Sequence, residues 1–138
     1  MKPANIERIA LIGPTGAGKT TTARHVADLL GWRALDTDEL VEQAVGKPIA
    51  AIFADEGEAA FRQRESEALA HALAERRVVV ATGGGIGERE ANRTLMRSCG
   101  WVISLAVSPA TSWRRVQHAA AVEPVSYTHL TLPTILRV

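Results

Sequence analysis

The sequence is poor in the features that mark secreted, membrane or metal-rich proteins. It contains one cysteine, Cys99, so no internal disulfide is possible and a reducing, cytoplasmic setting is expected. We expect Cys99 to be a small, partly buried residue near a helix end. No apolar run approaches the roughly 18 residues of a membrane span. Residues 1–7 lack the zones of a signal peptide.

Charge of one sign is also scarce. The formal net charge of the 138 residues is +1, which argues against nucleic-acid or membrane partners. A length of 138 residues fits one domain, and a hydrophobic content of 46% is normal for a globular chain. We expect a monomer. The last stretch differs, because no Asp, Glu, Lys or Arg lies between Pro124 and Leu136, whereas 22% of the whole chain is charged.

Short apolar runs alternate with helical patterns along the chain. The runs at 6–12, 32–35, 78–81 and 101–107 predict strands, and 20–30, 58–75 and 88–97 predict helices. Gly31 should end the first helix, Thr37 should cap the second, Gly57 should break the chain, and Pro109 should open a helix through about Gln117. This alternation predicts an α/β fold in three layers, with a parallel sheet between helices.

The residues from Gly13 to Thr20 match the pattern G-x-x-x-x-G-K-[ST], between a predicted strand and a predicted helix. This P-loop wraps phosphate oxygens with backbone N–H groups. We expect Lys19 to reach the β- and γ-phosphates of ATP and Thr20 to ligate Mg²⁺. The nucleotide-binding set is therefore Gly13, Gly16, Ala17, Gly18, Lys19, Thr20 and Thr21.

Asp36 and Asp38 follow the second predicted strand, at the sheet edge where α/β proteins bind ligands. Asp36 suits a water-mediated contact to the metal, and Asp38 suits a base that accepts the proton of an attacking hydroxyl. Helix capping by the same residues is the alternative, and taken alone these residues slightly favour it.

Arg62 lies on a predicted helix with Glu58 and Glu65 on the same face. It suits bidentate recognition of a substrate carboxylate, and the alternative is a surface ion-pair ladder. Arg64, on another face, is expected to be solvated.

Gly83, Gly84 and Gly85 end the third predicted strand. Three glycines in a row favour close approach of the backbone to a substrate, and the alternative is a tight turn.

Taken together, these motifs resemble those of the shikimate kinases. The family combines the P-loop with Asp-x-Asp after the second strand, an F-x-x-x-G-E-x-x-F-R-x-x-E helix start and a triple glycine. Here these are Gly13 to Thr20, Asp36 to Asp38, Phe53 to Glu65, and Gly83 to Gly85. The agreement in order and spacing extends from about Ile9 to Leu105.

The resemblance implies transfer of the ATP γ-phosphate to the 3-hydroxyl of shikimate, in aromatic amino acid biosynthesis. It implies that Lys19 and Asp38 are catalytic and that Arg62 holds the shikimate carboxylate. It also implies that Asp38 and the three glycines contact the substrate, and that the sheet has five parallel strands.

The sequence departs from the family pattern after Leu105. Glu123-Pro124 stands where the family has an Arg-Pro pair in a mobile lid. We therefore expect residues 1–123 to be an incomplete shikimate kinase-like domain with four of five strands, and residues 124–138 to be a foreign tail. A genuine edge strand in that tail is the alternative.

With this C-terminus we expect a weak or inactive kinase whose outer strand has an unpaired edge. A nucleotide-binding fragment and a gluconate-type kinase remain competing hypotheses. The gluconate-type kinase should carry His-Pro shortly after the acids, where Glu39-Leu40-Val41 stands here.

Overall fold

The computed structural model describes residues 6–106, Arg114 and 134–136, and only the backbone of the last three. The elements in order are β1 (Arg8–Ile12), α1 (Lys19–Leu30), β2 (Arg33–Asp36), α2 (Thr37–Val45), α3 (Ile49–Ala74), β3 (Val78–Ala81), η1 (Ile86–Glu88), α4 (Glu90–Cys99), β4 (Trp101–Ser104) and β5 (Thr134–Leu136). No helix among the described residues is long and apolar enough to cross a membrane.

The sheet has the order β2-β3-β1-β4-β5. The pairs β2–β3, β3–β1 and β1–β4 are parallel, which confirms the predicted parallel sheet and its four strands. Strand β5 lies in the tail, where an edge strand was the alternative to a foreign segment. It pairs antiparallel with β4, Ile103 opposite Ile135, so the expectation that β4 has an unpaired edge is wrong. Of the predicted helix from Pro109, the structure describes Arg114, which is helical, and the lid position Glu123 lies outside the described residues.

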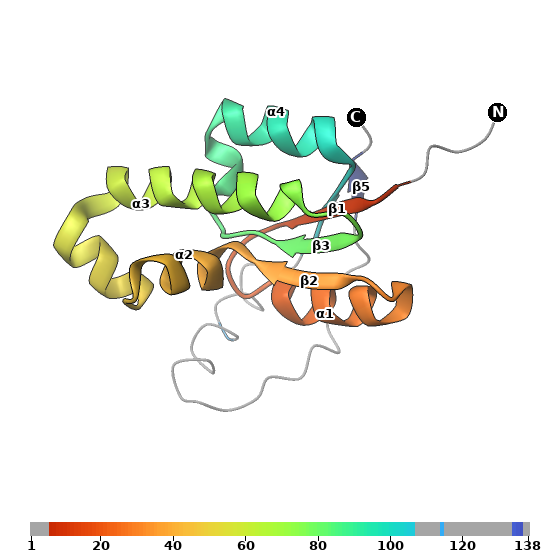
Figure 1. Cartoon of the computed structure of the whole chain (residues 1–138), viewed down its shortest axis with the longest axis horizontal. Coiled ribbons are helices and arrows are strands. Elements are labelled where there is room, and N and C mark those ends of the chain that lie inside the picture. The colour runs from red at the N-terminus through yellow and green to blue at the C-terminus, as the bar shows by residue number, and fades with distance from the viewer. Residues whose placement is uncertain (1–5, 107–113, 115–133, 137–138) are drawn as a thin grey trace.

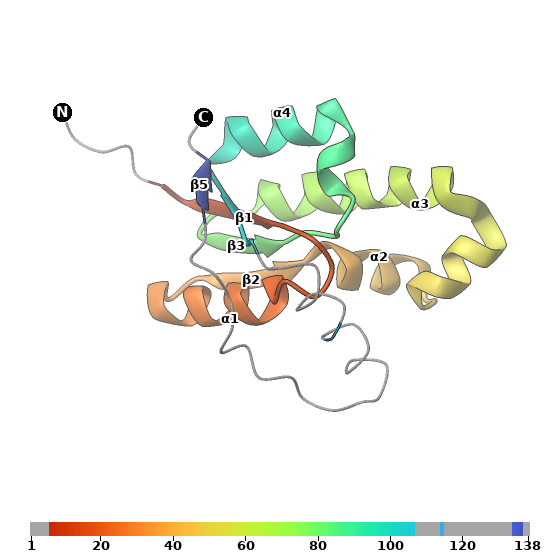
Figure 2. The ribbon, with the colours of Figure 1, turned by 180° about the vertical axis from the view of Figure 1, so that it is seen from behind.

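Helices cover both faces of the sheet, as Figures 1 and 2 show from opposite sides. Side chains alternate along a strand, so Val78 and Val80 face α3 and α4, whereas Val79 and Ala81 face α1. All four residues of β3 are at most 1% exposed. This burial on both faces is typical of a central parallel strand, and it confirms the three-layer prediction.

Helices α2 and α3 pack against each other through a separate apolar cluster containing Val41, Ile52, Phe61 and Ala68. Gly57 has φ 86° and ψ 172° and interrupts the α3 helix, as predicted. Across this interruption Arg64 pairs with Glu56 at 2.8 Å. The expectation that Arg64 is merely solvated is therefore wrong. This helical excursion between β2 and β3 carries Arg62 to the carboxyl edge of the sheet.

The predicted ends of the other helices and strands lie within a few residues of the observed ends or agree with them. Gly31 ends α1 in a left-handed conformation, as expected. Cys99 is partly buried at the last position of α4, which confirms its predicted setting. The fourth strand ends at Ser104 rather than at Val107.

Candidate active site

The phosphate loop joins β1 to α1. Gly16 and Gly18 have φ 83° and 87°, a left-handed backbone that side chains with a Cβ rarely adopt. Gly18 is the N-cap of α1 and offers no side chain to the first turn of that helix. The first N–H groups of a helix point out of its end and carry partial positive charge. The loop therefore has the geometry of an anion cradle.

Lys19 is 8% exposed at the start of α1. Its Nζ donates to the carbonyl oxygens of Gly13 at 2.6 Å and Pro14 at 3.0 Å. Burial lowers the pKa of the Lys19 ammonium, and the charges of Asp38 and Asp36 oppose that shift. The ammonium is thus anchored inside the loop that surrounds the anion cradle.

Asp36 connects the phosphate loop with α2. The Thr20 hydroxyl donates to Asp36 Oδ2 at 2.5 Å, and Asp36 Oδ1 accepts from the backbone N–H groups of Asp38 at 2.8 Å and Glu39 at 3.2 Å. Asp36 is therefore the N-cap of α2, and the prediction that Thr37 caps it is wrong by one residue. A hydroxyl beside a carboxylate is an oxygen-donor set that suits a hard cation such as Mg²⁺.

Asp38 lies in the first turn of α2 and is partly buried. Burial raises the pKa of its carboxyl to about 6, and the charges of Asp36, Glu65 and Glu42 add to the rise while Lys19 opposes it. A carboxylate whose pKa lies near the working pH is suited to accepting a proton from a hydroxyl.

The Arg62 guanidinium lies close to three carboxylates and is hydrogen-bonded to one of them, Glu65. Nη1 donates to Glu65 at 3.1 Å, and Nη2 lies 3.6 Å from Glu58 and 4.0 Å from Glu88. Burial alone would lower the pKa of Arg62, but the hydrogen bond it donates to Glu65 and the charges of all three acids raise that pKa above its ordinary value. Glu65 itself is 1% exposed, so one of these partners is buried and two are at the surface. The pairing with Glu58 and Glu65 matches the sequence-based expectation.

The three glycines after β3 bring these groups together. A Cβ on Gly83 would meet Glu65 Oε2 and Asp38 Oδ1, at 2.5 and 2.9 Å. A Cβ on Gly84 would meet Thr15 Oγ1 in the phosphate loop at 2.9 Å, and one on Gly85 would overlap the Arg62 guanidinium.

The triple glycine therefore touches the phosphate loop, the candidate base and the candidate carboxylate-binding arginine. Close approach explains all three glycines, which a tight turn alone does not.

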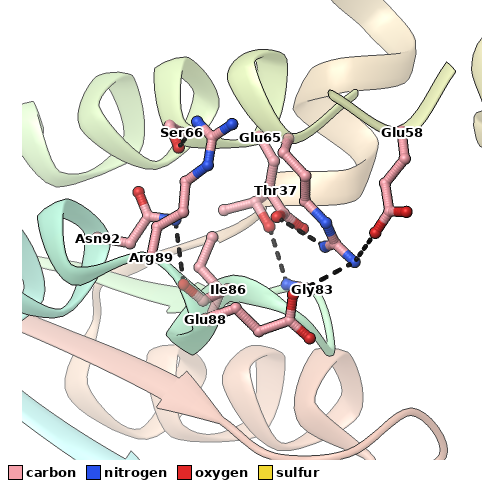
Figure 3. A network of polar contacts seen from close by, with 10 residues as sticks. Thr37, Glu58, Glu65, Ser66, Gly83, Ile86, Glu88, Arg89 and Asn92 are labelled. Carbon is pink, nitrogen blue, oxygen red and sulfur yellow. Dashed lines mark hydrogen bonds and ion pairs between the residues drawn. The ribbon is translucent and has the colours of Figure 1, made fainter. Parts of the chain in front are cut away.

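Several residues that shape this site were missed by sequence reasoning. The Thr37 hydroxyl, fully buried, accepts the Gly83 N–H at 3.0 Å and ties the triple glycine to α2. The Thr82 hydroxyl donates to the Leu11 carbonyl at 2.8 Å and ties the end of β3 to β1. Glu88 reaches Arg62 from η1 (Figure 3). The buried threonines directly flanking the Asp and Gly motifs were a usable signal, whereas nothing local marks Glu88.

The chain resembles known proteins along most of its length. Residues 15–129 match the family model described as shikimate kinase. The chain is 46% identical over 109 residues to a shikimate kinase of Symbiobacterium thermophilum, with 79% of this chain and 63% of the relative covered. It is 47% identical over 107 residues to a shikimate kinase of Moorella thermoacetica, with 78% and 62% covered. The chain thus spans a little over 60% of the length of these relatives.

Solved structures agree. The structure titled shikimate kinase from Acinetobacter baumannii in complex with shikimate superposes with a TM-score of 0.81 at 38% identity. That match covers 84% of this chain and 65% of the other. A gluconokinase from Sinorhizobium meliloti superposes with a TM-score of 0.53 at 20% identity, over 83% of this chain and 66% of the other, which is a likeness of fold alone. The matching family model and the identity to curated relatives show that the chain belongs to the shikimate kinase family.

Proposed function

We propose that this chain binds Mg-ATP and shikimate and carries the groups that transfer the γ-phosphate of ATP to the 3-hydroxyl of shikimate. The observation that supports the proposal is the close packing around Gly83, Gly84 and Gly85, where an added Cβ would meet Asp38, Thr15 of the phosphate loop and Arg62. A phosphate donor site, a base and a carboxylate-binding cation are what a kinase for a hydroxy acid requires. The names of the relatives support shikimate as that acid.

Each residue has a role in this proposal. Lys19 and the backbone of Gly13 to Thr21 bind the phosphates, because they form the anion cradle. Thr20 holds Mg²⁺ directly and Asp36 holds it through water, as their adjacent oxygens allow. When bound, ATP supplies the phosphoryl group, and Mg²⁺ supplies positive charge that neutralises the phosphate oxygens.

On the acceptor side, Arg62 holds the carboxylate and the glycine backbone contacts the ring. Asp38 accepts the proton of the 3-hydroxyl. A monomer in the cytoplasm, with no nucleic-acid or membrane partner, belongs to the same proposal.

Binding measurements on the 138-residue chain test the two halves separately. We expect Lys19→Ala to remove most Mg-ADP binding in calorimetric titration, and Lys47→Ala, which removes a half-exposed surface lysine, to leave it unchanged. Arg62→Ala should abolish shikimate binding and keep nucleotide binding. The loss of a buried charge-assisted pair typically costs about 2 to 5 kcal/mol.

Arg64→Ala is the matched control for Arg62, because Arg64 lies two residues away on the same helix and pairs with Glu56 instead. Equal shikimate affinity in the parent and Arg62→Ala would contradict the acceptor assignment.

ADP formation by this chain should stay below the roughly 1 to 100 turnovers per second of ordinary kinases. The reason is that the sequence has Glu123 where the family pattern has an arginine, so the charge at that position has the wrong sign.

A further inference from the structure

Arg62 faces more negative charge than it needs for neutralisation. Glu58 and Glu65 approach its guanidinium from α3 and Glu88 approaches it from η1, and Figure 3 labels these three acids. Glu65 is buried and hydrogen-bonded to Nη1, and this one contact already pairs the cation. Glu58 and Glu88 are 69% and 71% exposed and both approach Nη2. Three carboxylates around one guanidinium leave a formal surplus of two negative charges at a site proposed to bind an anion.

The two surface acids approach Nη2 without bonding to it. Their distances of 3.6 and 4.0 Å exceed the roughly 3.2 Å of an N–H···O bond. Among the described residues, the guanidinium donates one side-chain hydrogen bond, from Nη1 to Glu65. The Nη2 edge therefore keeps its donors for an incoming carboxylate, while Glu58 and Glu88 act on that carboxylate through their charge.

The backbone of Glu88 is fixed beside Arg62 by its own loop. Its N–H donates to the Gly85 carbonyl at 3.1 Å, next to the Arg62 guanidinium. The amide of Asn92, 3% exposed, donates to the Ile86 carbonyl at 3.0 Å and holds η1 against α4. Unlike Glu58 and Glu65, which come from the helix of Arg62 itself, Glu88 is brought in by a separate element.

We propose that Glu88 is a specificity-determining residue of the acceptor site, whose charge weakens the binding of carboxylate acceptors at Arg62. This inference rests on the proposed function. It assigns Glu88 no contact with the acceptor. The effect is repulsion between two anions that share one guanidinium, in competition with the attraction of Arg62.

The expected size follows from the exposure of Glu88. Two like charges about 6 Å apart in a water-like dielectric change an affinity about two- to fivefold. Charges at this exposure are screened by salt, so the effect should shrink when the ionic strength rises from about 0.02 M to about 0.5 M, where the Debye length falls to a few Å. A change of shape at the site would not respond to salt in this way.

The test is calorimetric titration of shikimate into the 138-residue chain saturated with Mg-ADP, for the parent, Glu88→Gln and Glu90→Gln, at both ionic strengths. Glu90 is exposed, lies two residues after Glu88 and is not one of the three acids beside Arg62. The substitution Glu90→Gln removes the same charge as Glu88→Gln. We expect Glu88→Gln to bind shikimate two- to fivefold more tightly at low salt, with little difference at high salt. Mg-ADP affinity should be unchanged, and Glu90→Gln should match the parent.

Three results would overturn the inference. Equal or weaker shikimate binding by Glu88→Gln overturns it and leaves the proposed function intact. A gain that persists at high salt replaces repulsion with a steric cause and also overturns it. If no variant binds shikimate while all bind Mg-ADP, the proposed function fails as well, because there is no carboxylate affinity for Glu88 to weaken.

Discussion

Asp38→Asn should stabilise the folded chain above about pH 6 while removing the proposed base. The pKa of the Asp38 carboxyl rises from 3.8 to about 6 on folding, mainly because of burial, with Asp36 and Glu65 adding to it. A raised carboxyl pKa means that the folded state favours the neutral acid. Deprotonation therefore costs folding free energy, and asparagine, which is never charged, avoids that cost.

The pH dependence of unfolding gives the sign and the size of the change in stability that Asp38→Asn causes. Below about pH 4 the carboxyl is protonated in both states, so the stability it contributes is fully present and the substitution gains nothing. As pH rises through about 6 that stability is lost, and the gain from asparagine reaches its plateau. A rise of this size corresponds to about 3 kcal/mol at full burial, and partial exposure reduces it to about 1 to 3 kcal/mol.

Urea unfolding of the parent and Asp38→Asn between pH 4 and 8 measures this difference. EDTA in the buffer keeps cations away from Asp36 and Thr20, which lie beside the titrating group. Asp28→Asn, at an exposed position on α1, controls for the loss of one negative charge. Equal unfolding midpoints at pH 8, or a gain of the same size at pH 4 and pH 8, would refute the reasoning. The second result would mean that asparagine gains from a new hydrogen bond rather than from a lost charge.

Two further substitutions separate stability from binding. Gly85→Ala places a methyl group against the guanidinium of Arg62, and that flexible side chain can move away. The backbone at Gly85 has φ −99°, which alanine adopts without strain. The substitution should therefore lower shikimate affinity at least tenfold while changing the free energy of unfolding by less than about 1 kcal/mol; unchanged shikimate titration would contradict the close packing. Thr37→Val leaves the buried Gly83 N–H without its acceptor and should cost about 1 to 3 kcal/mol in urea unfolding. Thr37→Ser keeps the hydroxyl and should cost clearly less, and equal losses would assign the effect to packing.

Much of the fold could be predicted from local patterns. Val78 to Ala81 reads as a buried strand because four apolar residues stand between polar residues and glycines, and the structure has that strand at those bounds. Gly57 breaks α3 at the predicted residue. The N-cap of α2 was predicted one residue too late because aspartate and threonine both cap helices. The local sequence does not show which of the two is the last residue with an extended backbone.

The rest of the site depends on contacts between elements. Glu88 lies beside Arg62 only because η1 is folded onto α3, and the two residues are 26 positions apart. The role of Thr37 likewise depends on β2 and β3 being neighbours in the sheet. The antiparallel pairing of β5 joins segments separated by about 30 residues. No periodicity within a short window encodes such pairings.

The excursion between β2 and β3 has an evolutionary consequence. Its two helices pack on each other through a cluster of their own, and they supply the proposed acceptor contacts Asp38 and Arg62. The phosphate loop lies on the other side of β2 in the chain and is anchored by β1 and α1. Substitutions in residues 38 to 74 can therefore change part of the proposed acceptor site while the phosphate loop keeps its sequence. In this architecture the segment that forms the phosphate loop and the helices between β2 and β3 can vary separately.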